Sequence, residues 1–291
     1  MRIGSIDGRL ALIEDEGFVD VSKASDGRFT PDPQLIYERW DEFRAWAERF
    51  TGGMDAPLTL ERLQAPVPRP RQVFALALNY AAHAAEASRD IPSVPLTFTK
   101  FQSCLTGPFD DIVLPSQTVD WEVELVVVIG RLAKNVTPEQ AWSHVAGLMV
   151  GQDISERTIQ HQGRPPQFSL GKSFPGFGPT GPWVCTPDSL PDPDDLAISC
   201  VVDGELLQES RTSKMIFPVA ELVSRLSQIC TLLPGDLIFT GTPEGVGAHR
   251  KPPRFLSVGS VVESRVDGIG EIRNRLVSAV EPAVGLARAA R

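Results

Sequence analysis

The sequence predicts an α+β protein in which strands predominate. Short runs rich in Val, Ile, Leu and Phe are separated by turn sequences such as VDGE at 202–205 and DGIG at 267–270, as in strands joined by hairpins. Only a few segments repeat apolar residues at helical spacing. A proline-dense stretch, APVPRPRQ at 65–72, favours a small N-terminal α+β domain at 1–68 and a larger domain at 69–291.

The N-terminal part is expected to contain strands followed by a helix. Residues 1–20 alternate short apolar runs with DG and DEG turn signals, which predicts a hairpin or meander. Residues 34–50 predict an amphipathic helix whose apolar face carries Leu35, Trp40, Phe43, Trp46 and Phe50. Strands are then expected near 73–78, 96–100, 112–114, 121–129, 147–153, 197–203, 205–209, 237–240, 261–266 and 270–278.

Two helices are expected in the larger domain. One begins at Thr137, because Pro138 and Gln140 complete a capping box with proline at the first helical position. The other spans about 218–230 and ends at LLPGD. Its predicted buried face carries Val219, Leu222, Val223, Leu226 and Ile229.

The composition limits the class of partner and the location. The chain has 291 residues, of which 42% are hydrophobic and 22% charged, with a net charge of -9 and no run rich in Lys or Arg. This argues against a nucleic-acid partner. No apolar run is long enough to span a membrane, and the N-terminal residues lack the apolar core of a signal peptide. With four well-separated cysteines, a cytoplasmic location is expected.

Two acids interrupt an apolar strand, VDWEVELVVVIG at 119–130. Glu122 and Glu124 lie two residues apart, so both carboxylates should lie on one face, where they repel each other. Asp153 ends another apolar run, LMVGQDIS. Taken singly, the acids fit a solvated strand end and Asp153 fits a turn or a helix cap. Three carboxylates from two strand ends would instead form an all-oxygen site for Mg²⁺, Mn²⁺ or Ca²⁺ rather than Zn²⁺.

A glycine pattern at 176–181, GFGPTG, matches the form of a dinucleotide-binding loop. Pro175, Pro179 and Pro182 remove amide donors that a phosphate would need, and the residues that follow are broken by prolines. We therefore do not interpret it as a nucleotide site, and we expect a loop there.

Five separated motifs together resemble the fumarylacetoacetate hydrolase family over about residues 70–280. They are LNYAAHAAE, PLTFTKFQSCLTGP, VDWEVELVVVIG with GQDIS, LGKSF with GPTGPW, and PGDLIFTGTPEGVG. The resemblance implies the family's mixed β-sandwich or β-roll with a few helices. It also implies that Glu122, Glu124 and Asp153 hold a divalent cation, usually Mg²⁺ or Mn²⁺.

The resemblance further implies roles for residues around that cation. His83 and Glu86 match a pair that lies on a lid and activates water, and Lys172 matches a lysine that stabilises an enolate. Lys100, Arg157, Gln160 and Thr242 match positions that contact the substrate.

The leading hypothesis is a metal-dependent hydrolase that cleaves a C–C bond in an acylpyruvate-like 1,3-diketo acid. Decarboxylation of an oxaloacetate-type 2-oxo acid is an alternative, as is isomerase or hydratase chemistry at the same site. A metal-stabilised β protein without catalysis is the alternative from another class. By resemblance, the partners expected are a small diketo or 2-oxo acid and a second copy of the chain in a homodimer.

Overall fold

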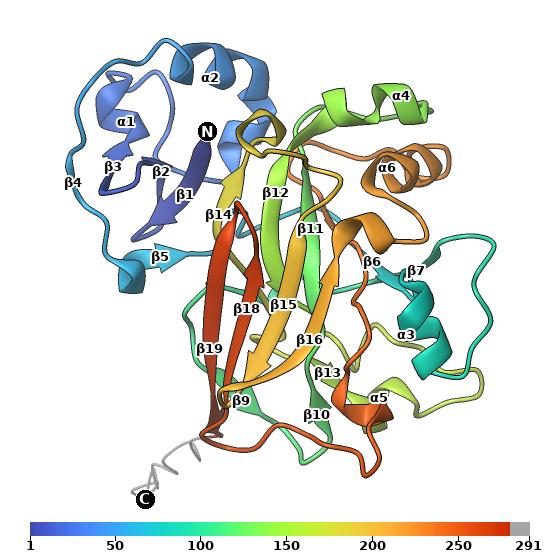
Figure 1. Ribbon diagram of the computed structural model, residues 1–291. Helices are drawn as coiled ribbons and strands as arrows, with labels where there is room; N and C mark the ends of the chain where they lie inside the picture. The colour runs from blue at the N-terminus through green and yellow to red at the C-terminus, as the bar shows by residue number, and fades with distance from the viewer. Residues whose placement is uncertain (280–291) are drawn as a thin grey trace, which may run out of the picture.

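The computed structural model describes residues 1–279 (Figure 1). The last residues of the predicted larger domain, 280–291, lie outside the described part. Strands outnumber helices and most helices are short, which confirms the predicted α+β class with predominant β structure. No helix within residues 1–279 is long and apolar enough to cross a membrane.

A twelve-stranded mixed sheet forms the body of the molecule. In spatial order its strands are β4 (Ala56–Pro57), β3 (Gly17–Asp20), β2 (Arg9–Ile13), β1 (Arg2–Ile6), β14 (Gly178–Cys185), β12 (Val145–Gln152), β11 (Val123–Ile129), β17 (Leu237–Phe239), β6 (Val73–Ala77) and β7 (Leu96–Thr99). Two short strands extend it, β5 (Leu63–Gln64) on β1 and β8 (Leu105–Thr106) on β14.

A second, five-stranded sheet packs against the middle of the first, in front of β11 and β12 in Figure 1. Its order is β16 (Glu205–Arg211), β15 (Ala197–Val202), β18 (Val261–Val266), β19 (Gly270–Ser278) and β9 (Ile112–Leu114). A separate pair joins β10 (Val119–Asp120) to β13 (Ser155–Glu156).

The helices lie at the periphery of the two sheets (Figure 1). The α-helices are α1 (Val21–Ala24), α2 (Trp40–Ala47), α3 (Ala81–Glu86), α4 (Pro138–Ala141), α5 (Arg157–Gln160) and α6 (Val219–Ser227). The 3₁₀ turns are η1 (Leu35–Arg39), η2 (Leu60–Arg62), η3 (Gln102–Cys104), η4 (Trp142–His144), η5 (Pro187–Ser189), η6 (Thr212–Lys214) and η7 (Gly247–His249). The capping box predicted at Thr137 is present at the start of α4.

Strand β11 is buried on both faces, because it separates two hydrophobic cores. Trp121, Val123 and Leu125 belong to the core between the two sheets, while Val126 and Val128 belong to the core shared with the N-terminal region. The alternation of side chains predicted for this strand is therefore present, but its second face is buried rather than half-exposed. Any charged group on that face needs a partner inside the protein.

The N-terminal residues continue the main sheet. Strand β1 pairs antiparallel with β14, and residues of α2 such as Trp40 and Phe43 share a core with Val126. Hydrogen bonds and apolar packing continue across the predicted domain boundary between 68 and 69. The division into two domains therefore stays a prediction.

Two predicted helices are shorter in the structure than their apolar pattern. The segment predicted at 34–50 begins as η1, and Leu35 is 42% exposed because the 3₁₀ turn directs it away from the core. The segment predicted at 218–230 ends at Ser227, so Ile229 lies beyond α6 and is 85% exposed.

Strand β14 was missed because its prolines cannot donate to a ladder. The structure accommodates Pro182 at a register shift: Val150 pairs with Gly181, whereas Leu148 pairs with Cys185. The bulged ladder leaves Pro182 outside regular pairing, so the segment serves as an internal strand of the sheet. The prediction of a loop at 176–181 is therefore wrong for most of this stretch.

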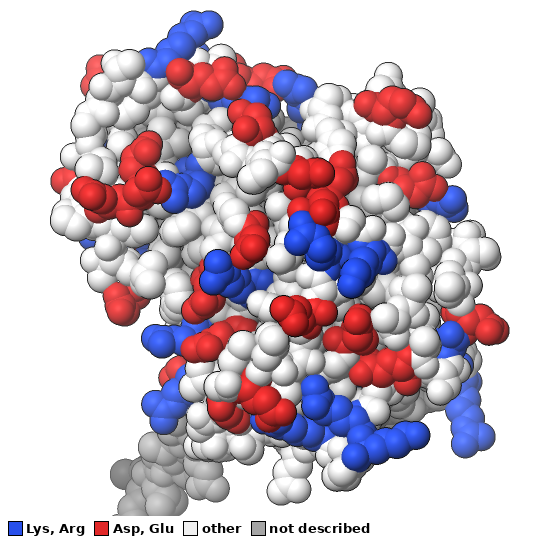
Figure 2. Space-filling model, in the orientation of Figure 1, with Lys and Arg blue, Asp and Glu red and all other residues white. Residues whose placement is uncertain are grey.

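Acidic and basic side chains alternate over the face shown in Figure 2, without a continuous basic patch on it. This distribution agrees with the negative net charge of the sequence.

Candidate functional site

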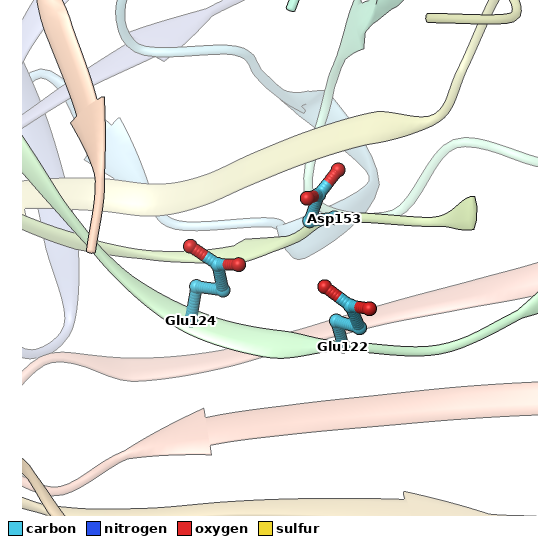
Figure 3. Close-up of side chains that lie close together, drawn as sticks. All are labelled: Glu122, Glu124 and Asp153. Atoms are coloured by element: carbon cyan, nitrogen blue, oxygen red, sulfur yellow. The ribbon is translucent and has the colours of Figure 1, made fainter. Parts of the chain in front are cut away.

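The three predicted acids meet at the ends of two paired strands. Glu122 precedes β11, Glu124 lies within it, and Asp153 follows β12, whose Gln152 pairs with Val123. One carboxylate oxygen from each acid lies within 4.8 Å of the others (Figure 3). Glu124 and Asp153 are fully buried and Glu122 is 7% exposed, so the alternative of a solvated strand end does not apply.

Lys172 lies directly against this triad. Its Nζ donates to Oε2 of Glu122 at 2.7 Å, Oδ2 of Asp153 at 2.6 Å and Oγ of Ser155 at 2.8 Å. From the other side, Lys100 Nζ donates to Oδ1 of Asp153 at 2.7 Å. Two buried lysines thus share one aspartate, and each charge is compensated within hydrogen-bonding distance.

Arg157 joins Glu122 to a second buried acid, Asp120, which sequence reasoning missed. Its Nη1 lies 2.7 Å from Oε1 of Glu122, and its Nε and Nη2 donate to Oδ2 of Asp120 at 3.0 and 2.8 Å. Asp120 also accepts the backbone N–H groups of Gly247 and Ala248, which positions η7. The available signal was a third acid inside the recognised motif VDWEVEL, two residues before Glu122.

The pKa values of the two glutamates are shifted in opposite directions. For Glu122, burial would raise the pKa, but the charges of Lys172 and Arg157 outweigh it and lower the pKa to about 2. For Glu124, burial raises the pKa well above its ordinary value, and the neighbouring Asp153 and Glu122 raise it further. Glu124 contacts no cation within the described residues.

The triad fits a hard divalent cation. Oε2 of Glu124 accepts the Gly241 N–H at 2.7 Å, but its buried Oε1 has no partner within residues 1–279. An orphaned carboxylate oxygen is costly unless a cation or a proton satisfies it. Three carboxylate ligands with no histidine or cysteine among them suit Mg²⁺ or Mn²⁺.

Helix α3 carries the predicted histidine–glutamate pair, and the two side chains are in contact. His83 Nδ1 lies 3.0 Å from Oε2 of Glu86, and Oε1 of Glu86 accepts the Gly245 N–H at 2.9 Å. Burial would raise the pKa of Glu86, but these two hydrogen bonds lower it overall. Since an ionised carboxylate only accepts, Nδ1 of His83 carries the hydrogen and its Nε2 is left as the basic nitrogen.

A cavity of about 150 Å³ is lined by one member of the triad, Glu122, and by one member of the histidine–glutamate pair, His83. The predicted residues that line it are His83, Glu122, Arg157, Gln160, Lys172 and Thr242. Among the other lining residues, Arg89, His161, Phe168 and His249 were not predicted from sequence. His249 lies beside the base, with its ring centroid 5.8 Å from that of His83. No motif pointed to these four, because their segments meet only in the folded chain.

Two predicted substrate contacts are placed differently. Lys100 does not line the cavity: it is 1% exposed and lies behind Asp153, so its expected contact with a substrate stays a prediction that this position does not support. Thr242 lines the cavity, but its hydroxyl donates to the Val123 carbonyl at 2.9 Å and accepts from Gln208 at 2.8 Å. Gln160 lines the cavity and accepts from Arg157 Nη1 at 2.8 Å.

Comparisons with known proteins agree with this site. Residues 72–277 match the family model described as fumarylacetoacetate (FAA) hydrolase C-terminal. A bovine protein named oxaloacetate tautomerase FAHD2B, mitochondrial, is 47% identical over 215 residues, covering 73% of this chain and 68% of its own length.

Two solved structures extend the likeness to almost the whole chain. A Mycobacterium smegmatis protein provisionally described as HpcE has 50% identity and a TM-score of 0.91, covering 96% of this chain and 100% of its own. Maleylpyruvate hydrolase from Sphingobium sp. SYK-6, solved with manganese (II) ion and pyruvate, has 28% identity and a TM-score of 0.79. It covers 96% of this chain and 99% of its own.

The fold and an acidic triad that could bind a divalent metal define the class of enzyme, and the sequence match identifies its family. The chain belongs to the fumarylacetoacetate hydrolase family and is an enzyme of that family.

The prediction of a cytoplasmic location is contradicted by these comparisons. Two bovine relatives, each 47% identical to this chain, are both named as mitochondrial proteins. The prediction relied on isolated cysteines and an ordinary soluble composition. Those features indicate a reducing environment, but they do not distinguish one reducing compartment from another.

Proposed function

We propose that this enzyme interconverts the keto and enol forms of a short oxaloacetate-like 2-oxo acid, with a divalent cation as cofactor. The observation that carries the proposal is that His83, whose Nδ1 lies 3.0 Å from Oε2 of Glu86, lines the same small cavity as Glu122 of the triad. Moving a proton between C3 and the 2-oxygen needs one positioned base and positive charge near the oxygen. The tautomerase name of the bovine relative supports this reaction.

Glu122, Glu124 and Asp153 would hold Mg²⁺ or Mn²⁺. When bound there, the ion supplies a Lewis acid that makes C3 of a 2-oxo acid more acidic. The protein side of the site is already arranged for it, because Asp153 is held by two lysines and Glu122 by Lys172 and Arg157.

The protein groups divide the proton transfer between them. His83 Nε2 takes the proton from C3, while Glu86 accepts the hydrogen bond from Nδ1 and stabilises the imidazolium that forms. Lys172 lines the same cavity and provides a buried positive charge, which would stabilise the negative charge that develops on the oxygen. Gly245 anchors Glu86, so the base is supported by the backbone of a second segment.

The size of the cavity favours a short substrate. Its volume of about 150 Å³ lies below the ~300–1,000 Å³ typical of pockets for drug-sized ligands. A four-carbon 2-oxo acid suits such a space better than a bulky diketone.

Hydrolysis of a C–C bond in an acylpyruvate-like acid is the second candidate. The His83–Glu86 pair could take a proton from water as well as from carbon, and the structure solved with manganese and pyruvate is of a hydrolase. Decarboxylation of oxaloacetate is the remaining alternative and requires no such base.

One assay separates these reactions. The enol absorbance of oxaloacetate is followed with Mg²⁺ or Mn²⁺ and then with excess chelator, while pyruvate is measured in parallel. Isomerisation accelerates the change in absorbance without forming pyruvate, whereas decarboxylation produces pyruvate from oxaloacetate. An acylpyruvate tested the same way reports hydrolysis by forming pyruvate and a carboxylic acid.

Variants of the base complete the test. His83→Ala and Glu86→Gln should each lower the rate of isomerisation, His83→Ala by about 10²–10⁴-fold, with the affinity for the cation unchanged. Full activity of His83→Ala would refute the assigned base.

We also propose a homodimer, for which exposed apolar residues at the edge strand β7 and around it provide support. Ile91, Val94, Leu96 and Phe101 are 62%, 54%, 43% and 50% exposed. Sedimentation equilibrium of the full chain tests this, and a monomer at micromolar concentration would refute it.

A further inference from the structure

Arg89 lies at the mouth of the cavity, just after α3. Its backbone N–H donates to the Ala84 carbonyl at 2.9 Å, which ties the turn to the helix that carries His83. Its side chain lines the cavity and also an adjoining groove formed by residues 90–98 and 166–168. Arg89 is exposed, whereas Glu122 and Lys172 are buried, so these residues mark the outer and inner ends of one cavity.

The positive charge of Arg89 is not used by the protein. The other strong cations of the lining are compensated, Lys172 by Glu122 and Asp153, and Arg157 by Asp120 and Glu122. The side chain of Arg89 makes no ion pair or hydrogen bond within the described part of the chain. Among residues 1–279, Glu122 is the only acid that lines the cavity, and it is already bound at the inner end.

A 2-oxo acid held at the inner end directs its remaining carbon atoms toward this mouth. We infer that Arg89 binds the distal carboxylate of the substrate and so selects dicarboxylic 2-oxo acids. This inference rests on the proposed function. The guanidinium of an arginine can donate two parallel N–H hydrogen bonds to one carboxylate. A substrate with a neutral tail cannot accept this pair of hydrogen bonds, so it should bind less tightly. The adjoining groove is lined by apolar and polar side chains, Asp90 among them, and Arg89 is its only cation within residues 1–279.

The test measures binding without turnover. The ligands are 3,3-difluoro-oxaloacetate, which has no C3 hydrogen to lose, and its 4-amide, which differs only in lacking the distal charge. Dissociation constants are measured by calorimetry with the full chain in excess Mg²⁺. The wild-type protein should bind the dicarboxylate at least about tenfold more tightly than the amide.

Arg89→Gln should abolish most of this preference, and its affinity for the amide should stay within about twofold of wild type. Arg49→Gln is the matched control, because Arg49 is also exposed after a short helix and donates its N–H back to that helix, at Trp46, but lies outside the cavity. It removes the same charge and should keep the full preference.

The outcomes separate this inference from the proposed function. Retention of the preference by Arg89→Gln, or an equal loss in Arg49→Gln, would overturn the role of Arg89 and leave the proposed function intact. Failure of the wild-type protein to bind either acid in the presence of Mg²⁺ would overturn both.

Discussion

The two sides of the acidic triad are built differently, although Glu122 and Glu124 are only two residues apart. On one side, Glu122 is bound by Lys172 at 2.7 Å and by Arg157 at 2.7 Å, and its pKa is lowered. On the other, Glu124 receives one backbone N–H, from Gly241, and keeps a buried oxygen without a partner in the described chain. One side is neutralised by the protein itself, and the other requires a proton or an added cation.

A charge count over the cluster leads to the same conclusion. Four buried carboxylates, from Asp120, Glu122, Glu124 and Asp153, face three cations, of which Lys100 and Lys172 are buried and Arg157 is partly buried. With every group ionised the cluster carries one negative charge. A divalent cation together with one substrate carboxylate makes it neutral, so the protein favours the loaded state without being unstable before loading.

Replacing each glutamate in turn gives the largest expected contrast. Both Glu122→Gln and Glu124→Gln should abolish metal-dependent activity, because each removes a ligand charge. In chelator, Glu122→Gln should lower the free energy of unfolding by about 3–5 kcal/mol, since it leaves buried cations uncompensated. Glu124→Gln should leave it unchanged or raise it. Denaturant unfolding measures both, and equal losses would contradict the difference between the two sides.

Removing Arg157 should make the Glu122 side resemble the Glu124 side. Arg157→Met leaves Asp120 and Glu122 with fewer compensating donors and should cost about 3 kcal/mol of unfolding free energy. Arg157→Lys keeps the charge but loses the fork that reaches both acids, so it should recover only part of the stability. Full recovery by lysine would show that charge alone matters there.

The pH dependence of metal binding tests the Glu124 side alone. With its raised pKa, Glu124 holds a proton above the ordinary carboxyl range, and the cation must displace it. Affinity for Mg²⁺ should therefore rise with pH, by at most about tenfold per pH unit for one proton. In chelator, the free energy of unfolding should change with pH in the opposite direction. It should fall as the pH rises from the ordinary carboxyl pKa toward the raised pKa of Glu124. Calorimetry in two buffers counts the proton, and none released would contradict the assignment.

Thr242→Val should have the smallest effect and should leave both sides of the triad unchanged. The variant removes a hydrogen bond to the Val123 carbonyl and one from Gln208, at a cost of about 1 kcal/mol of unfolding free energy. Affinity for Mg²⁺ should match wild type. A large loss of affinity would show that Thr242 controls the position of β11.

Sequence reasoning located most strands and the three acids of the triad, because these depend on local patterns. Alternating apolar residues identified β11, and the spacing of Glu122 and Glu124 placed both acids on one face. Sequence reasoning failed where the pairing of strands overrides the local preference of the residues. Strand β14 contains prolines that only a bulged ladder accommodates, and Ile229 follows the apolar period of a helix that has already ended.

The sequence by itself determined the predominance of strands, the three acids and the His83–Glu86 pair, since each follows from spacing along a single element or a short motif. Only the tertiary structure decided how these charges are shared. Lys100 lies behind Asp153 rather than in the cavity, and Arg89 reaches the cavity mouth, because segments distant in the chain meet there. Burial and ion pairing depend on such long-range contacts, and no local pattern encodes them.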